Sequence, residues 1–228
     1  MSNIKSTFLF IFRFFLILGC GYGLLKEMGL FDGRFSLKHL VYYTILSNLM
    51  IFLAYSYLLV RYLLSHKRFG HFEWRDFSPN VMSGLMLMIV VTGLIYNFIL
   101  APTLPNSSPY SLTNLSNFLV HTYTPVMVFI DWLLLSRHRD SKQLHPLTWV
   151  VIPLVYWVFT IVYASFKIPV NSQGGYYPYF FINADKYGWP QVFKNVGLLL
   201  VAFLVLGYML KGLSYLLYDK KFNEKNKR

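Results

Sequence analysis

Six long stretches of almost uninterrupted apolar residues run along the 228-residue chain. Each is long enough to supply the roughly 20 residues that an α-helix needs to cross the hydrocarbon core of a bilayer. Apolar positions are continuous and do not alternate with polar ones, which favours helices over the strands of a β-barrel. The sequence therefore predicts an all-α, polytopic membrane protein, a bundle of six transmembrane helices with the spans Phe8–Leu25, Leu40–Leu64, Pro79–Ala101, Leu115–Ser136, Pro146–Lys167 and Pro190–Leu217.

The composition agrees with this pattern. Charged residues make up only 13% of the chain, against about 25% in a typical soluble domain. The loops between the spans are too short to hold a soluble domain. We therefore expect one transmembrane domain over residues 1–218, followed by a short basic cytoplasmic tail over residues 219–228 that is disordered.

The basic residues predict the orientation of the bundle. The net charge is +12, but the lysines and arginines flank the spans and form no soluble basic face, so we expect contacts with lipid headgroups and none with nucleic acid. Lysine and arginine are enriched on the cytoplasmic side of membrane proteins. This rule places both termini in the cytoplasm, because most of the basic residues then lie on that side: Lys5, Arg61, Lys67, Arg68, Arg75, Arg137, Arg139, Lys142, Lys211, Lys220, Lys221, Lys225, Lys227 and Arg228.

Polar residues inside the spans gather at one depth. With this topology Thr44 in the second span and His121 in the fourth both lie roughly 6–9 Å below the outer boundary, at 1.5 Å per residue. The second, third, fourth and sixth spans contribute polar residues to this level, which predicts a chamber open to the outer leaflet. The alternative is that these polar side chains only form hydrogen bonds that hold neighbouring helices together. The further candidates for substrate or oxyanion contacts are Ser47, Asn48, Tyr96, Asn97, Asn117, Lys194 and Asn195.

Pro125 follows His121 by four residues. It lacks the N–H group that would bond the His121 carbonyl in an α-helix, so we expect a bend beside the histidine and a free acceptor there.

Arg13 and Asp131 form a second pair at matched depth, near the inner ends of their spans. A single buried charge would cost several kcal/mol, so a structural ion pair is the leading interpretation. The alternative is that Asp131 faces the chamber and tunes a proton-handling site.

The residue types at the outer level fit nucleophilic catalysis. A threonine hydroxyl becomes a nucleophile when a neighbouring base takes its proton, and histidine suits that role near neutral pH. Asn48, Asn97 or Asn117 would then donate a hydrogen bond to the oxyanion. No His, Asp or Glu cluster has metal-ligand spacing at this depth and no glycine loop suits a phosphate, so neither a metal nor a cofactor is expected.

Four motifs in order resemble the androgen-induced-protein-like family of six-span membrane proteins, bacterial branch: Tyr42-Tyr43-Thr44-Ile45-Leu46-Ser47-Asn48-Leu49, Val91-Thr92-Gly93-Leu94-Ile95-Tyr96-Asn97, His121-Thr122-Tyr123-Thr124-Pro125 leading to Asp131-Trp132, and Tyr177-Pro178-Tyr179-Phe180. Animal members are threonine hydrolases that cleave fatty-acid esters of hydroxy fatty acids. The resemblance implies Thr44 as the nucleophile and His121 as its general base. Ser47-Asn48 after the threonine, and the proline one position earlier, depart from the animal pattern.

Together these features lead to the hypothesis of a plasma-membrane hydrolase that cleaves a lipid ester. Its partners would be the lipid substrate and the surrounding membrane lipids. Two alternatives use the same polar chamber: a carrier or channel for a small amphipathic molecule, and a lipid-binding protein without catalysis.

Overall fold

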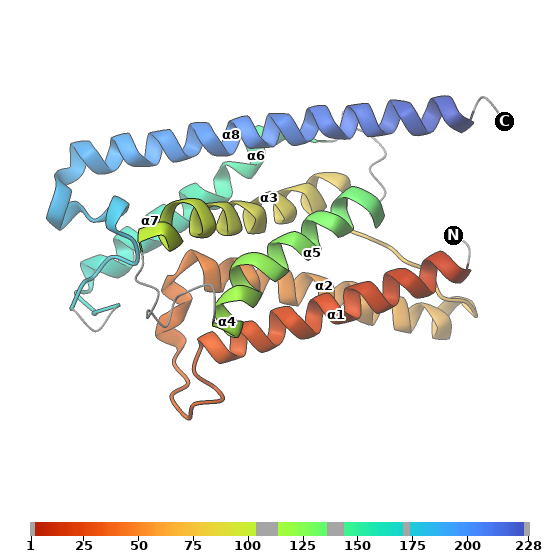
Figure 1. Cartoon of the computed structure of the whole chain (residues 1–228), viewed down its shortest axis with the longest axis horizontal. Helices are drawn as coiled ribbons and strands as arrows, with labels where there is room; N and C mark the ends of the chain where they lie inside the picture. Colours follow the sequence, from red (N-terminus) through yellow and green to blue (C-terminus); the bar gives the residue numbers. More distant parts are fainter. Residues whose placement is uncertain (1–2, 104–113, 136–143, 171–173, 226–228) are drawn as a thin grey trace. The chain divides into compact units, whose positions relative to one another are not determined.

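A computed structural model describes residues 3–103, 114–135, 144–170 and 174–225 (Figure 1). Within these ranges every regular element is helical, and no strand occurs. The chain divides into two compact units. Unit 1 comprises Met1–Leu37 and Thr44–His138, and unit 2 comprises Lys38–Tyr43 and Arg139–Arg228.

Unit 1 is built from three long helices and one broken one. The long helices are α1 (Asn3–Glu27), α2 (Tyr43–Phe69) and α3 (Pro79–Ile95), and α3 continues as the π-helical turn η2 (Tyr96–Leu100). The broken helix runs from residue 115 to 135 as α4 (Leu115–Phe118), η4 (Leu119–Tyr123), α5 (Thr124–Ile130) and η5 (Asp131–Leu135), where η4 and η5 are again π-helical turns.

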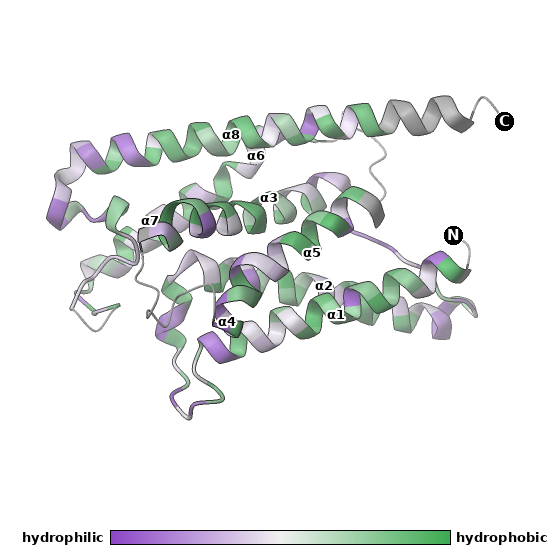
Figure 2. Cartoon of the chain, viewed as in Figure 1, coloured by the Kyte–Doolittle hydropathy of each residue, from purple (hydrophilic) through white to green (hydrophobic). Residues whose placement is uncertain are grey.

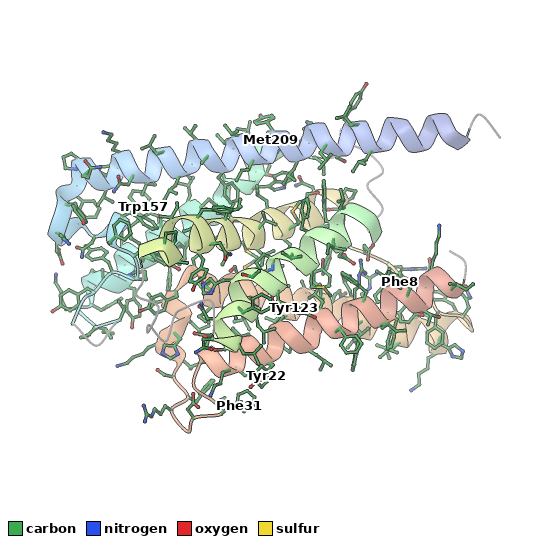
Figure 3. The ribbon with its side chains drawn as sticks, in the orientation of Figure 1. Phe8, Tyr22, Phe31, Tyr123, Trp157 and Met209 are labelled. Atoms are coloured by element: carbon green, nitrogen blue, oxygen red, sulfur yellow. The ribbon has the colours of Figure 1, made fainter. Side chains whose placement is uncertain are left out.

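The broken helix packs closely against α1. Tyr123 donates its hydroxyl to the Phe15 carbonyl at 2.9 Å, and its ring lies where a Cβ at Gly19 would stand. Figure 3 shows Tyr123 beside α1, with Tyr22 and Phe31 at the end of that helix. A residue without a side chain is therefore needed at position 19 for the two helices to approach this closely.

Unit 2 begins within the short helix η1 (Leu37–Val41), at Lys38. It continues with α6 (Pro146–Trp149), α7 (Val151–Ser165), η7 (Phe180–Ile182) and the long α8 (Ala184–Lys225). The backbone turns at Gly188, where φ is 74°, a value that favours glycine. A small core forms where Ile182 meets Val192 and Val196. The tail expected to be disordered from residue 219 is helical as far as Lys225, so that expectation is wrong; residues 226–228 lie outside the described part.

Among the residues described, five helices are long and apolar enough to cross a membrane, and Figure 2 shows that hydrophobic residues predominate along them. The protein is therefore a helical membrane protein. The predicted span Leu115–Ser136, described here as far as residue 135, is not among the five, because π-helical turns divide it into short elements. The five spans are Ile4–Glu27, Tyr43–Phe69, Pro79–Leu100, Pro146–Ser165 and Ala184–Leu217.

The expected ion pair of Arg13 and Asp131 is present inside unit 1. Arg13 donates from Nε to Asp131 Oδ1 at 2.9 Å and from Nη2 to Asp131 Oδ2 at 3.0 Å, and both side chains are fully buried. Tyr55 also donates to Asp131 Oδ2, at 3.0 Å. Because both Asp131 oxygens are bonded here, and His121 lies ten residues away or roughly 15 Å along the helix, this aspartate does not tune the histidine by contact.

Asp76, which the sequence did not single out, completes the network. It accepts from Arg13 Nη1 at 2.6 Å, and its side chain is 16% exposed. The Trp74 ring lies 4.7 Å from the guanidinium carbon, a cation–π contact. The segment before α3 is thereby joined to α1 and to the broken helix, and Asp76 adds a second carboxylate to the guanidinium.

The network predicts a large effect of Asp131→Asn on stability. The substitution leaves the buried guanidinium with Asp76 alone, so we expect a loss of about 3–5 kcal/mol, the usual result of removing one partner from a buried ion pair. The double substitution Arg13→Met, Asp131→Leu should recover part of it, because it removes both of the fully buried charges and leaves only the partly exposed Asp76. Denaturation in detergent measures both. Asp32→Asn is the control, since its pair with Lys26 is exposed; equal stability of Asp131→Asn and the control would contradict the prediction.

Candidate functional site

Thr44 and His121 meet inside unit 1. The Thr44 hydroxyl oxygen lies 3.1 Å from His121 Nε2, a hydrogen-bond distance. Thr44 stands in the first turn of α2 and is half-buried, whereas His121 lies within the π-helical turn η4 and is only 9% exposed. The contact predicted from their equal depths is therefore present.

The other ring nitrogen of His121 determines which of the two carries the proton. His121 Nδ1 lies 3.0 Å from the backbone carbonyl of Asn117, one turn earlier on the same helix. A carbonyl only accepts hydrogen bonds, so in the neutral ring the proton is on Nδ1 and the lone pair on Nε2. Nε2 is then the acceptor for the Thr44 hydroxyl, which is the arrangement of a general base beside a nucleophile.

Tyr96 packs against the face of the His121 imidazole, and Asn117 fixes Tyr96 in place. The Tyr96 ring stacks on His121 with the centroids 3.8 Å apart, and the Asn117 side-chain amide donates to the Tyr96 hydroxyl. Both residues were candidates for substrate or oxyanion contacts. In the structure their contacts position the histidine ring.

The helix departs from α-helical bonding at the histidine. The Thr124 N–H, which would bond the Val120 carbonyl in an α-helix, bonds the Leu119 carbonyl instead. Pro125 has no N–H to give to the His121 carbonyl. Two consecutive carbonyls, those of Val120 and His121, are thus released from the helix, as the proline led us to expect for the second.

Two asparagines from neighbouring helices take up these carbonyls. Asn48 Nδ2 donates to the Val120 carbonyl at 3.0 Å and to the Thr44 carbonyl at 2.8 Å. Asn97 Nδ2 donates to the His121 carbonyl at 3.1 Å and to the Gly93 carbonyl at 2.9 Å. An amide nitrogen has two hydrogens. Neither side chain retains one for an oxyanion, so the role considered for Asn48 and Asn97 is replaced by a structural one.

Ser47 also joins helices. Its hydroxyl lies 2.9 Å from the Thr92 hydroxyl of α3 and 3.1 Å from the Thr44 carbonyl, and it is 1% exposed. Thr92 donates in turn to the Met88 carbonyl at 3.2 Å. These contacts link α2 to α3 one helical turn after Thr44.

The two remaining candidates, Lys194 and Asn195, belong to unit 2. Lys194 is exposed. Asn195 donates to the Phe181 carbonyl at 2.8 Å and accepts from Gln191 Nε2 at 2.8 Å. Asn195 therefore fastens the segment around Phe181 to α8.

Glu27 is a carboxylate near this site that was not predicted from the sequence. It accepts from the Ser116 hydroxyl at 2.6 Å, and Ser116 directly precedes Asn117. A signal was present, because Glu27 lies two residues beyond the predicted outer end of the first span, close in depth to the outer start of the fourth span at Leu115. In the described part of the chain, no group of three or more His, Cys, Asp or Glu side chains is placed to hold a metal ion.

The close approach of the broken helix at Gly93 predicts that alanine at this position lowers the stability of the protein. A Cβ there would stand 2.9 Å from the His121 carbonyl oxygen and 3.0 Å from Pro125 Cβ. Gly93→Ala should therefore destabilise the protein by about 1–3 kcal/mol, although Gly→Ala inside a helix ordinarily stabilises by up to about 1 kcal/mol. Gly197→Ala in α8 is the matched control, because nothing lies within 4 Å of its added Cβ. A thermal melt showing both variants equally stabilised would refute the described packing.

Comparison with known proteins supplies no relative for this chain. No protein-family model matches it, and neither the curated proteins nor the solved structures contain a significant match. The resemblance to the androgen-induced-protein-like family therefore stays a prediction, and the function is argued from the site itself.

Proposed function

We propose that the protein is a membrane-embedded hydrolase that cleaves a lipid ester through Thr44, with His121 as the general base. The observation that carries the proposal is the 3.1 Å contact between the Thr44 hydroxyl and His121 Nε2, together with the Nδ1 contact to the Asn117 carbonyl that leaves Nε2 as an acceptor. A hydroxyl and an oriented base at this distance form the minimal unit of nucleophilic acyl transfer.

The reaction would proceed in two halves. His121 Nε2 takes the Thr44 proton while the threonine oxygen attacks the ester carbonyl carbon, which gives a tetrahedral oxyanion. Its collapse breaks the bond to the alcohol, and the alcohol leaves with the proton from Nε2. Water then attacks the acyl-threonine with His121 as base, which releases the fatty acid and restores the hydroxyl.

The oxyanion donors we propose are backbone N–H groups. Asn48 and Asn97 have no amide hydrogen left. The first N–H groups of a helix have no acceptor within it, and the helix dipole favours negative charge at this end. Tyr43 N–H bonds the Tyr156 hydroxyl at 3.1 Å. The donors we propose are therefore the next two N–H groups of the helix, those of Thr44 and Ile45, which belong to the same first turn as the nucleophile.

The membrane topology is part of the proposal. We propose that the protein lies in the plasma membrane and crosses it six times, with the helical run of residues 115–135 as the fourth span. Both termini would then lie in the cytoplasm. The excess of lysine and arginine at that side supports this orientation. The dyad then lies in the outer half of the bilayer. Exposed apolar side chains on α1 and α2, such as Leu18 and Leu53, contact the surrounding membrane lipids, and a lipid substrate would enter from there.

A carrier function is less well supported by the same unit. A carrier needs polar groups along a path through both halves of the membrane. At the other end of unit 1 the guanidinium of Arg13 and the carboxylates of Asp131 and Asp76 are bonded to one another. This arrangement suits an end of unit 1 that is closed to solutes, and it provides no series of polar groups along which a solute or proton could pass.

The proposal predicts that Thr44→Ala and His121→Ala each abolish ester hydrolysis. Thr44→Ser should keep measurable turnover, because a hydroxyl remains for Nε2. Purified protein would be assayed with a fluorogenic long-chain acyl ester and with a fluorophosphonate probe that labels activated hydroxyl nucleophiles.

The control is Thr148→Ala, which removes an exposed hydroxyl that bonds the nearby His145 carbonyl in unit 2. It should retain full turnover and labelling. Undiminished turnover in both Thr44→Ala and His121→Ala would exclude the dyad, and liposome flux of the lipid without cleavage would favour a carrier.

A further inference from the structure

Glu27 carries a carboxylate at an unfavourable end of its own helix. It is the last residue of α1, where the helix dipole disfavours negative charge, and it is half-buried. The neighbouring Lys26 bonds Asp32 at 2.5 Å. Within the residues that the structure describes, no lysine, arginine or histidine forms an ion pair with Glu27.

A buried hydroxyl fixes this carboxylate beside the candidate site. Ser116, which is 5% exposed, donates to Glu27 Oε1 at 2.6 Å and shares its proton with Asn114 Oδ1 at 2.8 Å. His121 lies five residues further along the same helix, roughly 7 Å on the axis. Asn117, the residue after Ser116, donates its side-chain amide to the Tyr96 hydroxyl, and the Tyr96 ring stacks on His121.

The position of Glu27 affects which chemical groups a bound substrate can place near the start of the broken helix. An ester held at Thr44 has an acyl chain, which belongs among apolar side chains, and an alcohol part, which belongs among polar ones. Glu27 places a half-buried charge at the end of unit 1 where the polar residues of the site lie. A carboxylate accepts hydrogen bonds from hydroxyl groups and repels another carboxylate.

We propose that Glu27 selects the alcohol part of the substrate: it favours esters of neutral polyols, such as monoacylglycerols, over esters whose alcohol part carries a free carboxylate. This inference rests on the proposed hydrolase function and narrows its substrate class. It also departs from the substrates that the family resemblance implies, since fatty-acid esters of hydroxy fatty acids carry such a carboxylate.

A purely structural role for Glu27 predicts something different. Its carboxylate bonds Ser116 in the first turn of α4, where negative charge stabilises the start of a helix. Loss of that contact alone would lower stability and would reduce turnover of all substrates alike. The ratio between two substrates therefore separates the two roles.

The experiment compares two esters of the same fatty acid in wild-type protein and in Glu27→Gln. One is the 1-acylglycerol, and the other is the acyl ester of glyceric acid, in which a carboxylate replaces a hydroxymethyl group. The glutamine side chain keeps the acceptor for Ser116 and removes the charge. We expect the wild type to prefer the acylglycerol, and Glu27→Gln to shift the kcat/KM ratio by roughly tenfold toward the glyceric-acid ester, as expected for one partly screened repulsion.

Two variants frame the result. Asp32→Asn removes an exposed carboxylate near the same helix end and should leave the ratio unchanged. Glu27→Asp keeps the charge and should retain the preference for the acylglycerol. An unchanged ratio in Glu27→Gln, or an equal shift in Asp32→Asn, would overturn the proposal.

A binding measurement keeps this test separate from the test of hydrolysis. In the Thr44→Ala background the non-hydrolysable ether analogues of both lipids are added, and the thermal shift of the protein is recorded with and without the further substitution Glu27→Gln. The acylglycerol ether should give the larger shift only when the glutamate is present. If wild-type protein cleaves neither ester, the hydrolase proposal fails while this preference still decides the role of Glu27; equal shifts would refute that role.

Discussion

The structure of unit 1 depends on two backbone carbonyls that the helix itself cannot satisfy. In hydrocarbon an unpaired carbonyl costs several kcal/mol, because no water is present to bond it. The π-helical turn and Pro125 release the carbonyls of Val120 and His121, and the amides of Asn48 and Asn97 bond them. The release of these carbonyls and their capture from two other helices occur within one turn of His121, so the need for hydrogen bonds determines where α2 and η2 meet the broken helix.

The same bonds place the candidate dyad. Asn48 bonds both Val120 on the broken helix and the carbonyl of Thr44 on its own helix, which fixes the first turn of α2 at the level of His121. Gly93 allows α3 to approach the His121 carbonyl closely enough for Asn97 to reach it. The 3.1 Å contact of Thr44 and His121 is thus a consequence of packing between three helices, and it would loosen with any one of them.

The positions of these groups were easier to predict from the sequence than their roles. Depth along a helix follows from counting residues, so the Thr44–His121 contact and the Arg13–Asp131 pair were both predictable. The direction of an amide was not, because an asparagine at this depth serves equally as an oxyanion donor or as a bond between helices. Asp76 and Glu27 were missed because each lies just outside a hydrophobic stretch. A charged residue is common at such a position, and the sequence alone does not show which residue it bonds. The helix beyond residue 219 was missed because a basic composition says little about a segment that continues a long helix.

The choice of a carbonyl to orient His121 follows from the surroundings. In many hydrolases a carboxylate holds the base, yet a buried carboxylate in a membrane needs a compensating charge, as Asp131 shows by its bonds to Arg13. The Asn117 carbonyl fixes the same tautomer without adding a charge. What it does not supply is a countercharge for the imidazolium that forms when Thr44 loses its proton. The Tyr96 ring, with its centroid 3.8 Å from that of His121, presents a negative π-face to that cation. The proposed mechanism thus uses an aromatic ring where hydrolases with a Ser-His-Asp triad use an aspartate.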